Sequence, residues 1–146
     1  MAEIAWADSS SLVGKWKLDT KASSLSQKAN KAGDAWDNAT LQKRSYVMEI
    51  ASYKNDGITL QYPSLDLTKS ATFDGKDYPT SGANSVKGET VSARYLNASG
   101  FEVEDKVDGK LMATSRFVIS SDGKMLTVMV MAPGKVTPDV MVYDRE

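Results

Sequence analysis

The side chains able to do chemistry in this sequence are carboxylates, amines, guanidinium groups and hydroxyls. The chain contains no cysteine and no histidine. These absences exclude thiolate nucleophiles, disulfides, zinc-hydrolase sites and Ser-His-Asp triads, and they remove the side chain that ordinarily titrates near neutral pH. Any acid–base catalysis would therefore use Asp, Glu, Lys or Tyr groups with shifted pKa values. We expect neither a metal ion nor a cofactor.

Asp105 is the carboxylate for which the pattern suggests an interior position. Hairpin turns at 97–100, 108–109 and 121–123 allow residues on neighbouring strands to be paired. In this register one face is mainly apolar and also carries Arg94, Asp105 and Arg116. A carboxylate flanked by two guanidinium groups can be buried at low cost, and the surplus positive charge would suit an anionic ligand group. The predicted interior face is Ser92, Arg94, Leu96, Phe101, Val103, Asp105, Val107, Met112, Thr114, Arg116, Val118, Leu126, Val128 and Val130.

The opposite assignment of faces stays open, because an error of one residue in a turn reverses the face of every strand beyond it. The three charged groups would then lie on the outer surface and form screened pairs worth about 0–1 kcal/mol. If the first assignment holds, Asp105 is the candidate general base, and Tyr95 is the second candidate catalytic group.

Five further side chains are candidates for ligand contacts. Tyr46 and Tyr62 could anchor a ligand through their hydroxyl groups, Met48 and Phe101 could line an apolar cavity, and Trp36 could cap it. Each of these residues has an equally ordinary role in packing the core or the rim. The sequence does not decide between the two roles.

The elements that must position these groups are short strands. Runs rich in Val, Ile, Thr, Tyr and Phe alternate with turn signals built from Asn, Asp and Gly. The segment 20–42 differs, and we interpret it as a long connection with one or two helical turns, serving either as a lid or as a packed surface loop. We predict strands at about 12–19, 44–53, 58–63, 65–73, 76–79, 89–96, 101–107, 110–120, 124–132 and 138–145.

Strands joined by hairpins favour an all-β, antiparallel, up-and-down barrel of about 8–10 strands, because closure removes the exposed sheet edges. A two-sheet sandwich is the alternative. The 146 residues, of which 41% are hydrophobic and 25% charged, predict one domain over 1–146, with a flexible N-terminus at 1–11.

The charge pattern argues against large anionic partners. The net charge is −1 and the chain has no long basic run, so we expect neither a nucleic-acid nor a membrane partner. The N-terminus has no basic region followed by an apolar one, which predicts a cytoplasmic protein or one whose leader has been removed. The oligomeric state is left open.

The stretch Leu12-Val13-Gly14-Lys15-Trp16-Lys17-Leu18 carries a Gly-x-Trp pattern and resembles the first strand of the lipocalin and fatty-acid-binding (calycin) group. In that group the Trp closes one end of the barrel and a basic residue from a late strand stacks on it. The resemblance implies that Arg145 or Arg116 has this role here. It also implies an interior that holds a ligand carboxylate with Arg and Tyr side chains.

An ordered set of segments is similar to small bacterial lipocalin-like proteins. The resemblance implies the fold and no particular reaction. The matching segments are Gly14–Asp19, Phe73–Pro79, Thr90–Ser92, Ser121–Lys124 and Val142–Arg145.

Three functions follow in order of preference. The first is non-enzymatic binding of a small apolar molecule, with an anionic group held by Arg94, Arg116 and a Tyr. The second is a cofactor-free isomerase, cyclase, hydratase or lyase that uses Asp105 and Tyr95 in the same cavity. The third is an interaction scaffold with a solid core and an exposed apolar patch.

Overall fold

The computed structural model describes residues 12–24, 47–134 and 136–146. Within these ranges the chain forms antiparallel strands and one short 3₁₀ turn, η3 (Pro63–Leu65). The strands are β1 (Gly14–Ser24), β2 (Val47–Tyr53), β3 (Gly57–Tyr62), β4 (Leu67–Thr72), β5 (Tyr78–Pro79), β6 (Glu89–Asn97), β7 (Gly100–Val107), β8 (Lys110–Ile119), β9 (Met125–Met131) and β10 (Asp139–Arg145).

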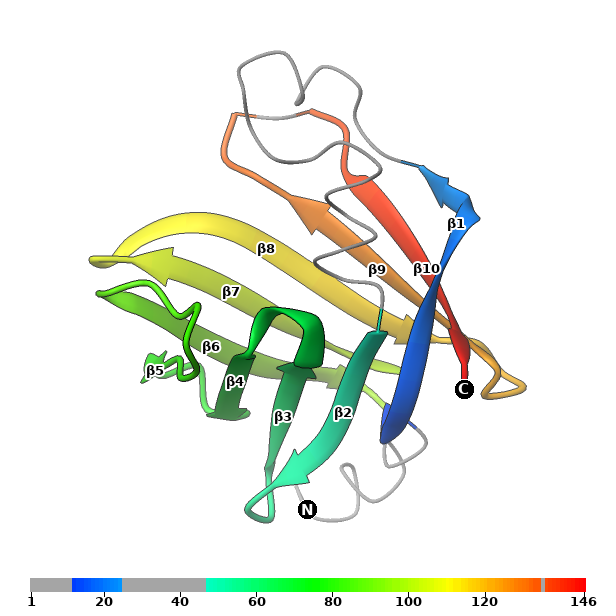
Figure 1. Cartoon of the computed structure of the whole chain (residues 1–146), viewed down its shortest axis with the longest axis horizontal. Coiled ribbons are helices and arrows are strands. Elements are labelled where there is room, and N and C mark those ends of the chain that lie inside the picture. The colour runs from blue at the N-terminus through cyan, green and yellow to red at the C-terminus, as the bar shows by residue number, and fades with distance from the viewer. Residues whose placement is uncertain (1–11, 25–46, 135) are drawn as a thin grey trace.

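The described strands form one sheet that curls into a barrel (Figure 1). Its order is β4-β3-β2-β1-β10-β9-β8-β7-β6-β5, so β1 pairs with both β2 and β10. Every other pairing joins strands that are consecutive in the chain, which is the up-and-down arrangement that the hairpin signals predicted. The single curled sheet confirms the barrel and excludes the two-sheet sandwich.

The barrel is nearly closed along a seam between β4 and β5, the two ends of the sheet. One isolated bridge crosses the seam, with Thr68 and Ser81 exchanging N–H···O bonds of 2.9 and 3.0 Å. Beside it, the hydroxyls of Thr72 and Tyr78 lie 2.6 Å apart, and Tyr78 donates a hydrogen bond of 2.6 Å to Asp74. Side chains therefore supply part of the closure that backbone pairing supplies elsewhere.

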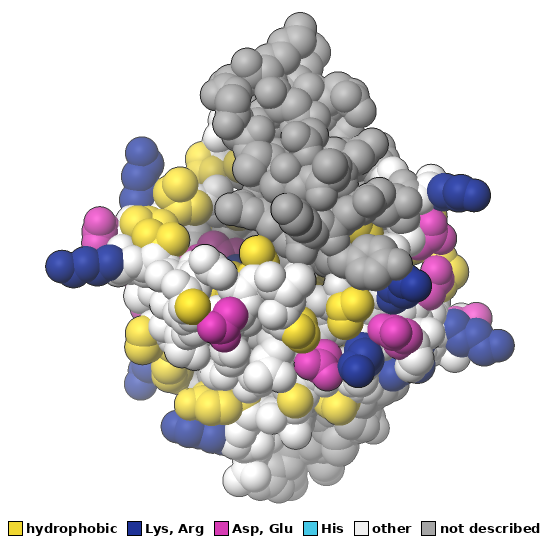
Figure 2. Space-filling view, viewed as in Figure 1, with side chains coloured by type: hydrophobic (Ala, Val, Ile, Leu, Met, Phe, Trp, Pro, Cys, Tyr) yellow, Lys and Arg dark blue, Asp and Glu magenta, His cyan; other side chains and the backbone are white. Residues whose placement is uncertain are grey.

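Alternation along the strands directs apolar side chains inward. Trp16, Tyr143, Met48 and Leu126 are at most 1% exposed. Charged side chains project from the outside of the barrel on the face shown in Figure 2. The buried aromatic rings pack against one another, with Phe101 and Phe117 stacked at a centroid distance of 4.6 Å.

Trp16 and Arg145 close one end of the barrel, as the calycin resemblance implied. The guanidinium carbon of Arg145 lies 4.3 Å from the centre of the Trp16 ring, and its Nη1 donates to the carbonyl of Val13. The indole N–H of Trp16 donates to the carbonyl of Leu12. A Cβ at Gly14 would lie 2.5 Å from the Arg145 Nη1, so a larger residue at this position would displace the guanidinium group.

The predicted strands correspond closely to the observed ones, with one extension. β1 continues to Ser24, so the first residues of the predicted connection 20–42 are strand. The remainder of that connection, its predicted helical turns, and the N-terminal segment 1–11 lie outside the described residues.

The predicted interior face is wrong for β6 and for most of β8, and β-bulges are the reason. In β6, Tyr95 pairs with Phe101 and Asn97 pairs with Gly100, so Leu96 is an extra residue and Arg94 points outward. A second irregularity, at the start of β8, shifts the register in the same way.

At this second bulge Asp105 pairs with Ala113 and not with Met112. Thr114, Arg116 and Val118 consequently face outward, and Ser115 and Phe117 face inward. The prediction for β7 is confirmed. The prediction for β9 is also confirmed. The turn between β8 and β9 is one residue longer than the expected turn at 121–123, and this difference cancels the one-residue shift made by the bulge in β8.

We predict that Arg145→Ala lowers the free energy of unfolding by about 1–3 kcal/mol, because it removes a cation–π contact and hydrogen bonds to backbone carbonyls. Urea unfolding followed by Trp fluorescence measures the change. Arg94→Ala, at an exposed position, should change stability by less than about 0.5 kcal/mol. Equal effects of the two substitutions would contradict the assigned role of Arg145.

We predict that Asp74, at the seam, makes a pH-dependent contribution to the stability of the fold. The hydrogen bond from Tyr78, with smaller contributions from the backbone of Lys76 and from Thr72, lowers the pKa of Asp74 from 3.8 to about 2. A carboxyl whose pKa is lower in the folded state stabilises the fold above the unfolded-state pKa and loses this contribution as the pH falls from about 4 to 2. Tyr78→Phe should therefore flatten the loss of stability over that interval, and Tyr95→Phe should not. Identical pH profiles for the two variants would count against the assignment.

Candidate functional site

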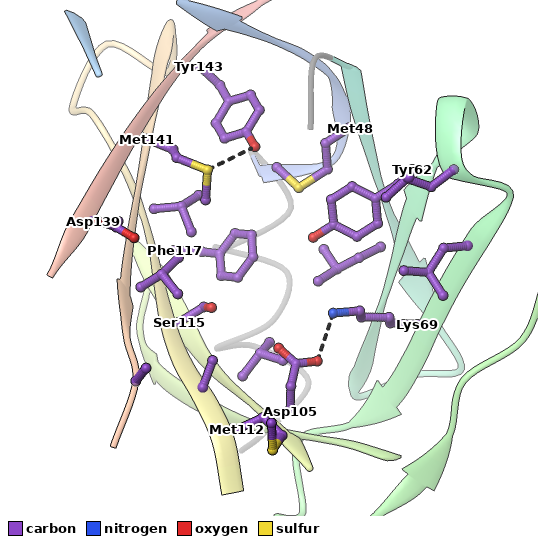
Figure 3. A pocket seen from close by; sticks show the side chains of 18 of the residues that line it. Met48, Tyr62, Lys69, Asp105, Met112, Ser115, Phe117, Asp139, Met141 and Tyr143 are labelled. Carbon is purple, nitrogen blue, oxygen red and sulfur yellow. Dashed lines mark hydrogen bonds and ion pairs between the residues drawn. The ribbon is translucent and has the colours of Figure 1, made fainter. Parts of the chain in front are cut away.

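A cavity of about 380 Å³ lies inside the barrel (Figure 3). Its wall is mainly apolar and is built by β2 to β4, η3 and β6 to β10. Met112 is 49% exposed although it lines the cavity, which places it at an opening. The lining residues are Met48, Leu60, Tyr62, Leu65, Leu67, Lys69, Glu89, Val103, Asp105, Met112, Ala113, Ser115, Phe117, Val128, Val130, Ala132, Asp139, Met141 and Tyr143.

An ion pair lies within this apolar wall. Lys69 of β4 and Asp105 of β7 are joined by an Nζ–Oδ1 distance of 2.7 Å, and their side chains are only 14% and 18% exposed. Asp105 reaches the interior by alternation from Phe101 and Val103, and Lys69 reaches it by alternation from Leu67. The pair connects strands on the two sides of the seam.

Tyr62, at the end of β3, places its hydroxyl in the cavity on the same side as Lys69 (Figure 3). The Lys69 Nζ lies 5.7 Å from the centre of the Tyr62 ring. Burial and, to a smaller extent, the charge of Asp105 raise the pKa of Tyr62 well above its ordinary value. The phenol therefore stays protonated and can donate a hydrogen bond.

Other polar groups lie elsewhere on the wall. Ser115 and Asp139 are 8% and 7% exposed. The Oε1 atom of Glu89 accepts hydrogen bonds from the backbone N–H of Val86 and from the hydroxyl of Thr80, at 3.1 and 3.2 Å. On β10, Tyr143 donates a weak hydrogen bond to the sulfur of Met141. Most of the remaining surface is aliphatic or aromatic.

The structure brings three of the predicted site residues together. Asp105, Tyr62 and Met48 all line the cavity. Phe101 is buried in the core and packs against Phe117 without belonging to the lining. Tyr95 is also absent from the lining and packs edge-on against Phe73. It pairs with Phe101, four residues before Asp105 on β7, so the structure does not place the two groups together in the cavity as we expected.

The two predicted arginines lie outside the barrel. Arg94 is exposed, and Arg116 is bound to Glu102 on the outer surface with an Nε–Oε2 distance of 2.9 Å. The expectation that they hold an anionic group in the cavity loses its basis, because the bulges in β6 and β8 turn both away. Trp36 and Tyr46 lie outside the described residues.

Sequence reasoning missed Lys69, Ser115, Phe117, Asp139, Met141 and Tyr143. Lys69 could have been found, because it shares a strand face with Leu67 and Ala71. The alternation of Met141 with Tyr143 was likewise readable in the sequence. Ser115 and Phe117 required knowledge of the bulge.

Neither a metal-binding cluster nor a membrane-spanning helix is found in the described ranges. No group of three or more acidic side chains among these residues is arranged to hold a metal ion. No helix found there has the length and apolar character needed to cross a bilayer.

Comparisons with known proteins identify the fold. No family model and no curated protein matches the sequence. Among solved structures, the fluorescent protein UnaG is 19% identical with a TM-score of 0.64, and the alignment covers 92% of this chain and 96% of UnaG. A fatty acid binding protein of Schistosoma mansoni in complex with arachidonic acid is 20% identical with a TM-score of 0.59, over 95% of this chain and 98% of that one.

Two further structures extend the comparison. The fatty acid transporter REP1-NXSQ is 13% identical with a TM-score of 0.62, over 92% of this chain and 96% of the transporter. A luciferase domain of the dinoflagellate Lingulodinium polyedrum is 13% identical with a TM-score of 0.56, over 92% of this chain and 41% of that one. The chain thus has the same barrel fold as these structures, two of which are a fatty acid binding protein and a fatty acid transporter, and this is the fold that the Gly-x-Trp resemblance implied.

We predict that Lys69 and Asp105 are energetically coupled. A double-mutant cycle with Lys69→Met and Asp105→Asn should give a coupling energy of about 1–3 kcal/mol, because each single change leaves its largely buried partner without an ionic contact. The surface pair Glu102–Arg116 provides the matched control, and its cycle should give less than about 1 kcal/mol. Equal couplings for the two pairs would argue against the interior placement of the Lys69–Asp105 pair.

Proposed function

We propose that this protein binds a small apolar molecule inside its barrel. The observation that carries the proposal is the cavity of about 380 Å³ with its largely apolar wall. Ligand sites in proteins ordinarily have this order of volume, an apolar lining and a few polar groups that fix orientation. The lining residues Met48 and Met141 have flexible side chains that can adapt to a bound molecule.

The structural neighbours support the same proposal. One is described as a fatty acid binding protein in complex with arachidonic acid, and another as a fatty acid transporter. The cavity also argues against a scaffold role, because a scaffold would gain stability from a solid core.

A second candidate function is cofactor-free catalysis in the same cavity. The Lys69–Asp105 pair favours it, because a carboxylate that could accept a proton lies beside an ammonium that could stabilise a developing negative charge. The luciferase domain has a similar barrel. Asp105 keeps the role predicted for it, and Tyr62, whose ring lies near Lys69, replaces Tyr95 as the candidate catalytic tyrosine. Under this alternative, Asp105→Asn would abolish turnover and retain binding.

Filling the cavity should abolish binding. We predict that Ala113→Trp weakens binding of a neutral solvatochromic dye by at least about tenfold, because the indole occupies the space of the ligand. Thr114→Trp, at the adjacent position facing outward, is the control and should bind the dye as the unchanged protein does. Fluorescence titration measures the affinity, and thermal unfolding verifies that both variants fold. If neither variant weakens binding, the dye is not in the barrel.

A further inference from the structure

We propose that the cavity selects an uncharged apolar molecule carrying a carbonyl or amide group, and discriminates against free carboxylates such as fatty acids. This inference rests on the proposed function, because it describes the ligand of the same cavity. It departs from the fatty acid bound by the Schistosoma mansoni protein and from the anionic ligand that the sequence suggested.

The charges on the cavity wall disfavour an anionic ligand. Among the lining residues in the described ranges, Lys69 is the one cationic side chain, and no arginine is present. Glu89 and Asp105 are carboxylates on the same wall, and Asp139 is a third. Among the described residues, the carboxylates on the wall therefore outnumber its one ammonium group. A further anion brought into this space would meet like charges in surroundings that screen them poorly.

The ammonium group of Lys69 is already engaged in an ion pair. It is 2.7 Å from Asp105, and both side chains are largely withdrawn from solvent. A ligand carboxylate could bind Lys69 only by displacing Asp105, which would leave a carboxylate buried without its partner, or by crowding two carboxylates around one ammonium. Either arrangement carries the penalty of an uncompensated buried charge.

An uncharged polar group meets no such penalty. An ammonium group has three N–H donors, and one of them is directed at Asp105. Another can be donated to a carbonyl oxygen with the ion pair intact. The phenol of Tyr62, which also faces the cavity, offers a second donor on the same side. The apolar body of the ligand would then lie against Phe117, Met48 and neighbouring side chains.

A matched pair of ligands tests the inference on the unchanged protein. Decanoic acid and decanamide have the same chain and nearly the same shape, and at about pH 7 only the acid is ionised. Displacement of a bound neutral dye should require at least about tenfold less decanamide than decanoate. Tighter binding of decanoate would overturn the inference and leave the proposed function standing. If the dye does not bind and neither compound binds by calorimetry, the proposed function itself fails.

A charge variant tests the physical reason. Asp105→Asn frees the Lys69 ammonium for an external anion, so the affinity for decanoate should rise by at least about tenfold while that for decanamide changes by less than about threefold. Glu102→Gln is the matched control, because it removes a carboxylate from the same strand on the outer face and should leave the ratio of affinities unchanged. If the two substitutions change the ratio equally, the selection does not come from the Lys69–Asp105 pair. The comparison on the unchanged protein stands even if a variant fails to fold.

Discussion

The ion pair between Lys69 and Asp105 is the contact on which both the architecture and the chemistry of this barrel depend. It crosses the interior from β4 to β7, near the seam where backbone pairing is reduced to one isolated bridge. The same two groups form an ion pair in a mainly apolar cavity wall, which also carries the carboxylates of Glu89 and Asp139. In the binding function that we propose, this contact both helps to close the sheet and determines which molecules the cavity accepts, since its ammonium group is already engaged.

The barrel is close-packed at one end and hollow farther along its wall. At one end, Trp16 is fully buried beneath the guanidinium group of Arg145, and this closes the core. Farther along the wall, β8 contributes small side chains at Ala113 and Ser115, which leave space that larger residues would fill. A close-packed core in one region and a cavity in the next are thus features of the same continuous sheet.

Strand positions and the fold could be predicted from the sequence, because turn residues and period-two alternation are local signals. Trp16 and Arg145 could be paired through the calycin resemblance. The inward faces of β6 and β8 could not be predicted, because the bulges at Leu96 and Met112 each insert one residue that no turn signal marks. The partner of Asp105 was also hidden, since Lys69 is 36 residues away in the chain and meets it only after closure.

The placement of a ligand within the barrel can be tested with the methionines of the chain. Met48 and Met141 line the cavity, and Met125 and Met129 lie on the outer face of β9. In a spectrum of protein labelled with ¹³C at the methionine methyl groups, a neutral apolar ligand should shift the signals of Met48 and Met141 and leave those of Met125 and Met129 in place. Shifts confined to the outer pair, or no shift at saturating ligand, would contradict a binding site inside the barrel.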